Sequence, residues 1–281
     1  MRLSITTSLL LMIMIAVNAT AKTGEGTFYQ YGGGGNCSFP VQNDIYTAAM
    51  NAKDYNESAA CGGVITVTNT DTDMSVTVRI DDQCPECAEG DVDLTQAAFE
   101  QIAELSTGRI PISWKYIPNP VAGNIKLFFK EGSSQYWTSI QVRDHRYPIS
   151  DLAYRQTSSG DSYQSLMRQS YNYFEKSDGF GTGPYDFRLT DFCGQTVDIL
   201  SVPFSVTTEI DAGLQLPVYA GTDCDLAANV VNGSTSGEAP TGTNSSTGNN
   251  SGALSMPVLL LLLIFRRKRC MFLKLGWQRP K

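Results

Sequence analysis

The sequence has a single histidine, His145, and fewer basic residues than acidic ones: 21 Lys and Arg beside 28 Asp and Glu, for a formal net charge of −7. One histidine excludes a histidine-rich metal site, and a Ser-His-Asp or Cys-His mechanism would depend on that residue alone. The acidic balance excludes a broad nucleic-acid surface, which needs an excess of Lys and Arg. With 42% hydrophobic residues in 281, the chain is not disordered as a whole and has the length of about two domains.

The N-terminal residues 1–21 have the pattern of a secretory signal peptide. Arg2 is their only charge, an apolar run follows, and Ala19-Thr20-Ala21 is typical of a cleavage site. A buried N-terminal helix is the alternative. Export predicts a secreted or cell-surface protein in which disulfides are permitted.

The C-terminal part divides into a linker and a tail. Residues 226–252 are rich in Ser, Thr, Gly and Asn, which predicts a flexible linker. Residues 253–281 combine an apolar run with the basic cluster 266–269. The run is shorter than the about 20 residues of a membrane span, so we expect no stable crossing. The pattern resembles bacterial sorting tails and allows a transient contact with a membrane or a sorting protease. A glycolipid-anchor signal and a frame-shifted tail are alternatives.

Removal of both ends makes the predicted mature protein strongly acidic. All 28 acidic residues lie between residues 22 and 255, beside only 13 of the 21 basic ones, for a net charge of −15. Such a surface predicts repulsion from anionic polymers and indifference to neutral ones. Salt should therefore assist binding to any target that contains anionic polymers.

The first half of the middle region has both strand and helix patterns. Residues 64–68 and 75–80 alternate with β-branched residues and predict a hairpin. Residues 110–117 predict another strand. A helix is predicted between them, from the N-cap Thr95 to Gly108. Its apolar face would consist of Leu94, Ala98, Ile102 and Leu105.

The second half begins after Pro118-Asn119-Pro120, the predicted domain boundary. Short strand candidates separated by turn residues follow, without a long helical period. This pattern is typical of an antiparallel sandwich. The predicted strands are residues 125–129, 136–142, 152–154, 185–189, 195–199 and 202–206.

Six cysteines lie in the predicted exported region, and the seventh, Cys270, lies in the tail. The even number indicates a disulfide framework. Their positions pair Cys193 with Cys224, while the other four allow three connectivities. The favoured pairing is Cys37 with Cys61 and Cys84 with Cys87. A zinc site at Cys84 and Cys87 is the alternative, although a second such pair or histidines would normally accompany it.

Two aspartates and two adjacent aromatics are candidates for function. Asp82 ends a predicted strand, and Asp93 precedes the predicted helix, where the helix N-terminus favours an ionised carboxylate. On spacing alone both also fit ordinary turn and helix-entry aspartates. Tyr136 and Trp137 cannot both enter a core from one regular strand, so at least one faces water or a bulge redirects it. Exposed aromatic rings match the apolar faces of sugar rings.

Residues 24–220 resemble microbial expansin-like proteins in both halves. The motifs that carry the resemblance are residues 26–29, 79–85 and 91–95, followed by 123–137, 140–148, 171–174 and 181–183. The resemblance implies a mainly β protein. A six-stranded double-psi β-barrel, shared with family-45 endoglucanases and RlpA-type proteins, would occupy residues 22–118. An immunoglobulin-like antiparallel β-sandwich that binds cellulose would occupy residues 119–225.

The resemblance also implies site residues. In the barrel, a polar polysaccharide groove would be formed by Thr27, Asp82 and Asp93, with Asp93 essential. Cys84 stands where the family has a groove tyrosine, and Phe28 or Tyr29 is the candidate to compensate. In the sandwich, a flat row would be formed by Tyr136, Trp137 and Tyr171, with Lys130 beside it. His145 is predicted to be structural, near a turn.

The function implied is that of a secreted, monomeric protein that binds cellulose and loosens plant-type walls without hydrolysis, with xyloglucan or other β-glucans as further partners. Inverting hydrolysis needs two carboxyl groups, whereas residues 27–29 contain none at the place of the endoglucanase base, and Glu25 is out of place. No cofactor, metal or nucleic acid is expected. The alternatives are a weak endoglucanase or an RlpA-like lytic transglycosylase acting through Asp93, and a pure binding module.

Overall fold

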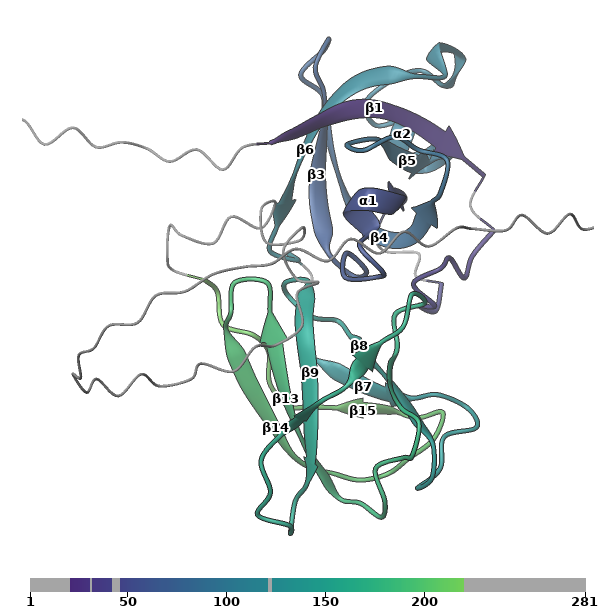
Figure 1. Cartoon of the computed structure of the whole chain (residues 1–281). Coiled ribbons are helices and arrows are strands. Elements are labelled where there is room, and N and C mark those ends of the chain that lie inside the picture. Colours follow the sequence, from purple (N-terminus) through teal and green to yellow (C-terminus); the bar gives the residue numbers. More distant parts are fainter. Residues whose placement is uncertain (1–20, 31, 42–45, 121–122, 220–281) are drawn as a thin grey trace, which may run out of the picture. The chain divides into compact units, whose positions relative to one another are not determined.

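The computed structural model describes residues 21–30, 32–41, 46–120 and 123–219. The predicted linker and tail, and the signal peptide except Ala21, lie outside them. Strands dominate the described residues, in a first group within residues 22–117 and a second within 126–211 (Figure 1). Among these residues no helix is long and apolar enough to cross a membrane.

The first group of strands closes into a barrel, in the order β1-β5-β2-β4-β3-β6, and β6 pairs back with β1. Two pairs, β1 with β5 and β2 with β4, are parallel, and the other pairs are antiparallel. This closed six-stranded barrel confirms the predicted fold of the first half. Its strands are β1 (Lys22–Tyr29), β2 (Tyr46–Asn51), β3 (Val64–Asn69), β4 (Ser75–Cys84), β5 (Val92–Thr95) and β6 (Ile110–Ile117).

Alternation explains how these strands form the barrel core. Along β6, the side chains of Ile110, Ile112, Trp114 and Tyr116 are buried, while the residues between them are exposed or half-buried. Side chains of a strand alternate between its two faces, so one face supplies the interior. The hairpin predicted at residues 64–80 is present as β3 and β4, and the strand predicted at 110–117 is β6.

The predicted helix after Asp93 is wrong in extent. Only Gln96–Phe99 forms an α-helix (α2), and a 3₁₀ turn, η1 (Leu105–Thr107), follows after a break. Leu94 belongs to β5, where it pairs with Phe28 and Ala48, so strand pairing overrides the helical pattern. Thr95 is the N-cap but its side chain makes no capping hydrogen bond, and Gly108 ends the 3₁₀ turn at a φ of 71°. Among the residues that the structure describes, the other α-helix is α1 (Ala52–Tyr55).

The second group of strands forms a sandwich of two antiparallel sheets. One sheet has the order β10-β9-β13-β14 and the other β11-β12-β8-β7-β15. Their buried apolar side chains, Phe129 and Phe187 among them, form one core cluster. The strands are β7 (Lys126–Phe129), β8 (Thr138–Arg143), β9 (Ile149–Gln156), β10 (Gln164–Ser165), β11 (Met167–Arg168), β12 (Phe174–Lys176), β13 (Tyr185–Asp191), β14 (Thr196–Val202) and β15 (Glu209–Asp211).

Two predicted strands of the sandwich differ from the structure. The strand predicted at 136–142 begins only at Thr138, because Ser134 and Trp137 are bridge partners around a turn. The strand predicted at 202–206 is not separate, since Val202 ends β14 and Val206 makes an isolated bridge with Phe129. The strands β10, β11, β12 and β15 were not predicted, because two or three residues are too few to display a period of two.

Barrel and sandwich lie in one compact unit of the chain, and hydrogen bonds join them. The Tyr55 hydroxyl donates to the Ser170 carbonyl at 2.9 Å. The carbonyl of Cys37 accepts hydrogen bonds from the side chains of Gln141, at 2.9 Å, and Asn172, at 3.1 Å. Main-chain carbonyls, which do not depend on side-chain rotamers, are thus the acceptors at this junction.

His145 is buried near a turn, with its Nδ1 2.8 Å from the carbonyl oxygen of Tyr147. Burial lowers the pKa of His145 to about 4, so the ring is neutral at ordinary pH. A Cβ added to Gly62 would lie 2.5 Å from its Nε2, so the ring fits only against a glycine. These contacts are those of a packed structural residue.

The disulfides Cys37–Cys61 and Cys84–Cys87 are present as predicted. The zinc alternative is wrong because both thiols of the Cys84–Cys87 pair are bonded to each other. Cys193 is also disulfide-bonded, and its predicted partner, Cys224, lies outside the described residues.

Candidate functional site

Thr27 and Asp93 lie side by side on neighbouring strands of the barrel. They are register partners in the parallel pair of β1 and β5, so their side chains project to the same face of the sheet. The Thr27 hydroxyl donates to Oδ1 of Asp93 at 2.5 Å. Both residues are half-buried. The structure therefore brings together two of the three predicted groove residues in direct contact.

The electrostatics of Asp93 are the reverse of what its sequence position predicted. Burial raises the pKa of Asp93, and the charges of Glu86 and Asp82 raise it further, while the Thr27 hydroxyl and Arg109 lower it. The predicted lowering of the Asp93 pKa by the helix N-terminus is wrong because Asp93 lies in β5, two residues before the N-cap of a single-turn helix. Burial thus outweighs the influence of the helix end.

Asp82 lies on β4 at a bulge. In the β2–β4 pairing, Ala48 faces Ile80 and Ala49 faces Asp82, so Asp81 is the extra residue. The Asp82 Oδ1 accepts hydrogen bonds from the backbone N–H groups of Asn36, at 2.7 Å, and of Gln83, at 2.8 Å. The Asp82 charge also acts on Asp93, which joins Asp82 to the Thr27–Asp93 pair.

Its neighbour Asp81 has a structural role. Asp81 is buried and forms two hydrogen bonds with the Arg79 guanidinium, at 2.6 and 2.8 Å. Burial raises its pKa, and the contact with Arg79 lowers it. At consecutive positions of the bulge, Asp81 therefore forms a buried ion pair while Asp82 is a groove carboxylate.

Two polar residues of this site escaped the sequence prediction. Asn36 binds Asp82 through its backbone, and its side-chain amide donates to the Tyr55 hydroxyl at 2.9 Å and to the Ser170 carbonyl at 3.0 Å. Glu86 is exposed in the loop closed by Cys84 and Cys87, and its charge raises the pKa of Asp93. The CxxC spacing shows that this loop directly follows β4. No sequence pattern predicts that the charge of Glu86 acts on Asp93 of β5.

The departure at Cys84 has a clear structural consequence. Cys84 is buried and bonded to Cys87, so no aromatic hydroxyl stands there. Phe28 does not compensate, since it has no hydroxyl and its ring packs 5.0 Å from that of Phe99. Tyr55, which interacts electrostatically with Asp82, supplies a phenol nearby, but it is buried and burial raises its pKa.

Two of the three predicted aromatic residues of the sandwich, Trp137 and Tyr171, lie around one lysine. The ammonium of Lys130 lies 6.0 Å from the ring centre of Trp137 and 5.3 Å from that of Tyr171. Tyr171 donates a hydrogen bond to Glu175, which holds its ring in place. Tyr136, next to Trp137, is 74% exposed. The prediction that at least one of the adjacent aromatics faces water is confirmed, and neither lies in the sandwich core cluster.

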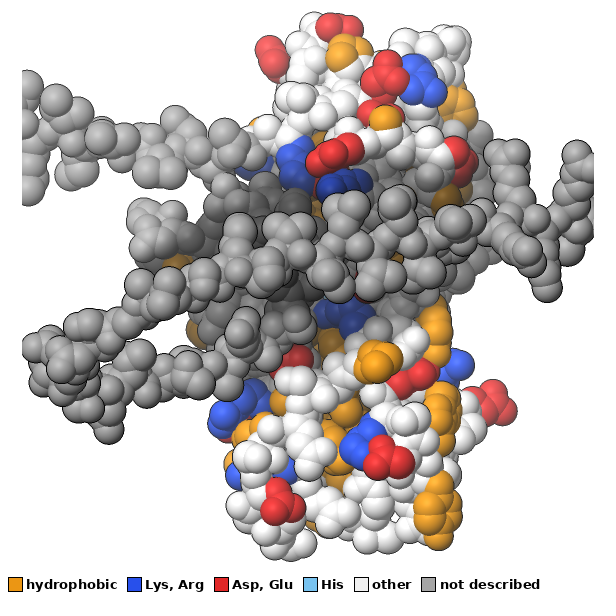
Figure 2. All heavy atoms as spheres, viewed as in Figure 1, with side chains coloured by type: hydrophobic (Ala, Val, Ile, Leu, Met, Phe, Trp, Pro, Cys, Tyr) orange, Lys and Arg blue, Asp and Glu red, His pale blue; other side chains and the backbone are white. Residues whose placement is uncertain are grey.

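Acidic and hydrophobic side chains both reach the surface. In the view of Figure 2 they appear on the barrel and on the sandwich, and hydrophobic side chains cover more of the sandwich. Glu25, on β1, pairs with Arg109 and lies outside the Thr27–Asp93 contact.

Within the described part of the chain, no cluster of three or more His, Cys, Asp or Glu could hold a metal ion.

Comparisons with known proteins agree with this architecture. A family model described as lytic transglycolase matches residues 47–114. The chain is 34% identical to Expansin-YoaJ of Bacillus subtilis over 179 residues, which are 62% of this chain and 73% of that protein. It is 26% identical to Expansin-like protein 1 of Dictyostelium discoideum over 248 residues, 84% of each chain.

Solved structures are similar as well. The apo expansin of Clavibacter michiganensis matches with a TM-score of 0.65 and 28% identity, over 71% of this chain and 100% of that one. A mutant of the same protein in complex with cellohexaose matches equally, with a TM-score of 0.65.

Proposed function

The chain belongs to the expansin family, and we propose that it is a secreted protein that binds cellulose and loosens cellulose-containing walls without hydrolysing them. The binding part rests on the rings of Trp137 and Tyr171 around Lys130, and on the exposed ring of Tyr136, the chain neighbour of Trp137. These residues are called the aromatic face. Support also comes from the similar Clavibacter expansin mutant, which was solved in complex with cellohexaose.

The aromatic face suits a neutral polysaccharide. Pyranose rings of β-glucans expose C–H groups on both faces, and these stack on aromatic rings. The Lys130 ammonium, within 6.0 Å of the Trp137 ring, adds a donor for sugar hydroxyls. Because neutral glucan carries no charge, the acidic balance of the chain does not oppose this contact.

The barrel groove would act on the glucan chain by hydrogen bonding. Asp93, fixed by Thr27, and Asp82, fixed by the Asn36 N–H, present carboxylate oxygens whose positions are set by the protein. Bonds to an ionised acceptor are about twice as strong as neutral ones. A glucan hydroxyl held there would exchange its bond to a neighbouring chain for one to the protein, which separates the chains without cleaving them.

The absence of cleavage is inferred from the sequence around Thr27. Residues 27–29 offer no carboxylate as a base, and the nearby Glu25 is paired with Arg109. Inverting hydrolysis requires a second carboxyl group placed to activate water. The decisive experiment measures extension of cellulose paper under load together with released reducing ends. We expect extension without release of sugar, and extension lost in Asp93→Ala. Sugar release that disappears in Asp93→Asn would overturn the non-hydrolytic part.

Weak glycan cleavage through Asp93 is the second candidate function. The raised pKa of Asp93 suits a general acid, and Glu86 is a second carboxylate close enough to influence it. The lytic transglycolase family model points the same way. Reducing-end assays on soluble β-glucan and on purified peptidoglycan would detect this activity. It should vanish in Glu86→Gln as well as in Asp93→Asn if the two carboxyls act as a pair.

Export is proposed from residues 1–21. N-terminal sequencing of protein from the culture medium should begin at Lys22. The mass of the same material would locate its C-terminus relative to residues 253–281. Retention of residues 1–21 in the extracellular protein would contradict cleavage at Ala21.

A further inference from the structure

A hollow of about 430 Å³ opens in the sandwich beside Tyr136. It is lined by two segments, the turn Ser133–Tyr136 and the loop Gly181–Gly183, together with Tyr185 and Phe204. The exposed Tyr136 of the aromatic face is therefore also a lining residue of the hollow.

Two of the rings that line the hollow are open to solvent. Tyr136 is 74% exposed and Phe204 is 37% exposed. The Phe204 ring is held by the core, with centroid distances of 5.1 Å to Phe129 and 6.4 Å to Tyr185. Because the core already holds the Phe204 ring, a sugar that stacks on its exposed face would cost this side chain little conformational freedom.

Glycines keep the two sides of the hollow together. The N–H of Gly181 donates to the Gln135 carbonyl at 3.1 Å. A Cβ on Gly179, whose φ is +73°, would lie 2.1 Å from the same carbonyl oxygen, and one on Gly183 would lie 3.1 Å from the Tyr185 ring. The chain before the loop thus packs against the turn of Tyr136 only because Gly179 carries no side chain, and Gly183 leaves room for the Tyr185 ring.

The residues that line the hollow also offer polar groups. Thr182 and Gln135 are exposed there. The Ser134 hydroxyl accepts the Tyr136 N–H at 3.2 Å, which leaves its proton for another acceptor. Apolar walls with a hydroxyl and amide rim match a pyranose, which has C–H faces and a hydroxyl edge.

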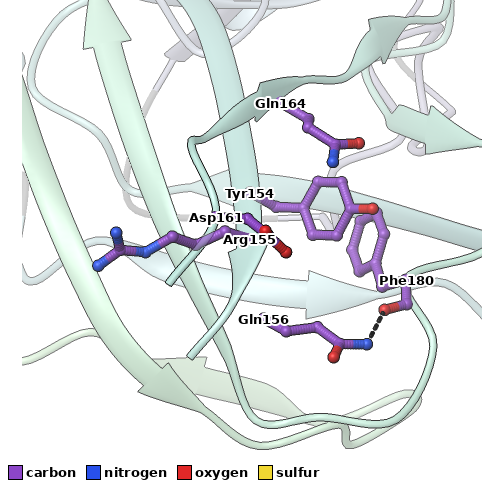
Figure 3. A pocket seen from close by; sticks show the side chains of 6 residues that line it. All are labelled: Tyr154, Arg155, Gln156, Asp161, Gln164 and Phe180. Carbon is purple, nitrogen blue, oxygen red and sulfur yellow. Dashed lines mark hydrogen bonds between the residues drawn. The ribbon is translucent and has the colours of Figure 1, made fainter. Parts of the chain in front are cut away.

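A second hollow, of about 260 Å³, lies around the side chain of Phe180 and lacks these features. In Figure 3 the rings of Tyr154 and Phe180 lie against each other, and Arg155 points away from them. The two rings stack at 4.2 Å and are 6% and 2% exposed, and the Gln156 amide is bound to the Phe180 carbonyl at 3.0 Å. No aromatic face is open there, so this hollow is not an alternative for a sugar.

We propose that the hollow between Tyr136 and Phe204 is an additional sugar subsite, which receives the next pyranose ring of a β-glucan chain lying on the aromatic face. The inference rests on the proposed cellulose binding and extends it by one ring. Tyr136 belongs to both surfaces, so a chain that leaves Trp137 over Tyr136 enters the hollow.

The test compares affinities for cello-oligosaccharides of stepwise increasing length, measured by titration calorimetry on the chain as secreted. In the wild type, affinity should rise with oligosaccharide length until the hollow is filled. The last sugar that raises the affinity should do so by about three- to tenfold, the size of one aromatic stacking contact. Phe204→Ala should abolish this last step and leave the affinity of shorter oligosaccharides unchanged. Thr182→Trp, which fills the hollow and keeps the core contacts of Phe204, should do the same. Leu200→Ala, at a position that is 61% exposed on β14, is the matched control.

The possible failures are distinguishable. If Thr182→Trp and Phe204→Ala, each with a wild-type unfolding midpoint, retain the wild-type length dependence, the subsite is contradicted while cellulose binding stands. If both variants weaken every oligosaccharide equally, the hollow is not a separate subsite. If no oligosaccharide binds the wild type, or if Trp137→Ala binds like the wild type, the proposed function itself fails.

Discussion

Barrel and sandwich present two opposite kinds of site. In the barrel, the groove side chains are half-buried carboxylates held by hydrogen bonds, and burial raises the pKa of Asp93. In the sandwich, the site consists of aromatic rings around an ammonium, with Tyr136 74% exposed. The first site can hold hydroxyl groups in defined positions, and the second can hold ring faces with little directional demand. The difference indicates that the two proposed activities, cellulose binding by the sandwich and loosening by the barrel, are separable by mutation.

The largest effect is expected at Asp93. Asp93→Ala removes a carboxylate acceptor whose hydrogen bonds contribute about 1.5–3 kcal/mol each, so extension activity should fall at least about tenfold. Binding to crystalline cellulose should not change, because the aromatic face is untouched. Asp71→Ala, an exposed barrel carboxylate, is the control and should retain activity. A parallel loss of cellulose binding in Asp93→Ala would break the division between the two sites.

Trp137→Ala should produce the complementary result. Loss of a large stacking ring typically costs about 1–2 kcal/mol at a binding surface, so cellulose pull-down should weaken about tenfold. Tyr46→Ala removes an aromatic residue that is 39% exposed on the barrel and serves as the matched control. Equal losses in both variants would mean that cellulose contacts aromatic rings without selecting the sandwich face.

The two regions also show which features of the structure could be predicted from the sequence. The period-two pattern and turn residues were sufficient to predict hairpin β3–β4, strand β6 and a sandwich, because alternation is a local property. The helix after Asp93 failed because the parallel partner of β5 is β1, more than sixty residues earlier in the chain, and local propensity contains no information on that pairing. The same pairing places Thr27 beside Asp93, which the motif resemblance implied without giving the contact.

The electrostatic environment of Asp93 was beyond sequence analysis for a related reason. Burial and the charge of Glu86 raise its pKa, and both depend on residues that are brought near Asp93 by the fold and not by a local pattern. The hydrogen bond from Asn36 to Asp82 likewise joins residues 46 positions apart. At residues 136–137, in contrast, the predicted exposure of at least one ring is confirmed although the assumed strand is absent there, since both residues lie in the turn before β8.

A smaller effect is expected at Lys130. Its ammonium lies over the Trp137 and Tyr171 rings, where it can donate to a sugar hydroxyl, and one such hydrogen bond contributes about 0.5–1.5 kcal/mol, or about two- to tenfold in affinity. Lys130→Met should weaken cellulose binding by that amount and leave extension per bound molecule unchanged. Lys115→Met, on an exposed position of β6, makes the same chemical change on the barrel as control. Stronger binding of Lys130→Met would show that the ammonium competes with the sugar for the rings.

The smallest effect is expected in the pH dependence of stability that Asp93 causes. The raised pKa of Asp93 means a stabilising contribution that is complete below the unfolded pKa of about 3.9 and is lost as pH rises through the folded pKa. Asp93→Asn, which stays neutral, should therefore unfold at higher urea than the wild type near neutral pH, and the difference should shrink towards about pH 3. A lower midpoint at neutral pH would contradict the burial cost assigned to Asp93.

Asp198 of the sandwich should behave in the opposite sense. The Arg188 guanidinium, bonded at 2.7 and 2.8 Å, lowers the pKa of Asp198. Its contribution is therefore present above the unfolded pKa and lost as pH falls through the folded pKa. Asp198→Asn should destabilise by about 0.2–1 kcal/mol at neutral pH, as for exposed ion pairs. Shifts of the same sign in both variants would mean that the two carboxylates do not differ as described.

The most direct test of the separation between binding and loosening is extension of cellulose paper divided by the amount of protein bound to the same strip. The wild type, Asp93→Ala and Trp137→Ala would be measured together. The structure predicts that Trp137→Ala extends the paper normally per bound molecule, while Asp93→Ala binds normally and extends it at least about tenfold less. Extension that follows the bound amount on one common line for all three proteins would contradict the account, since binding alone would then loosen the wall.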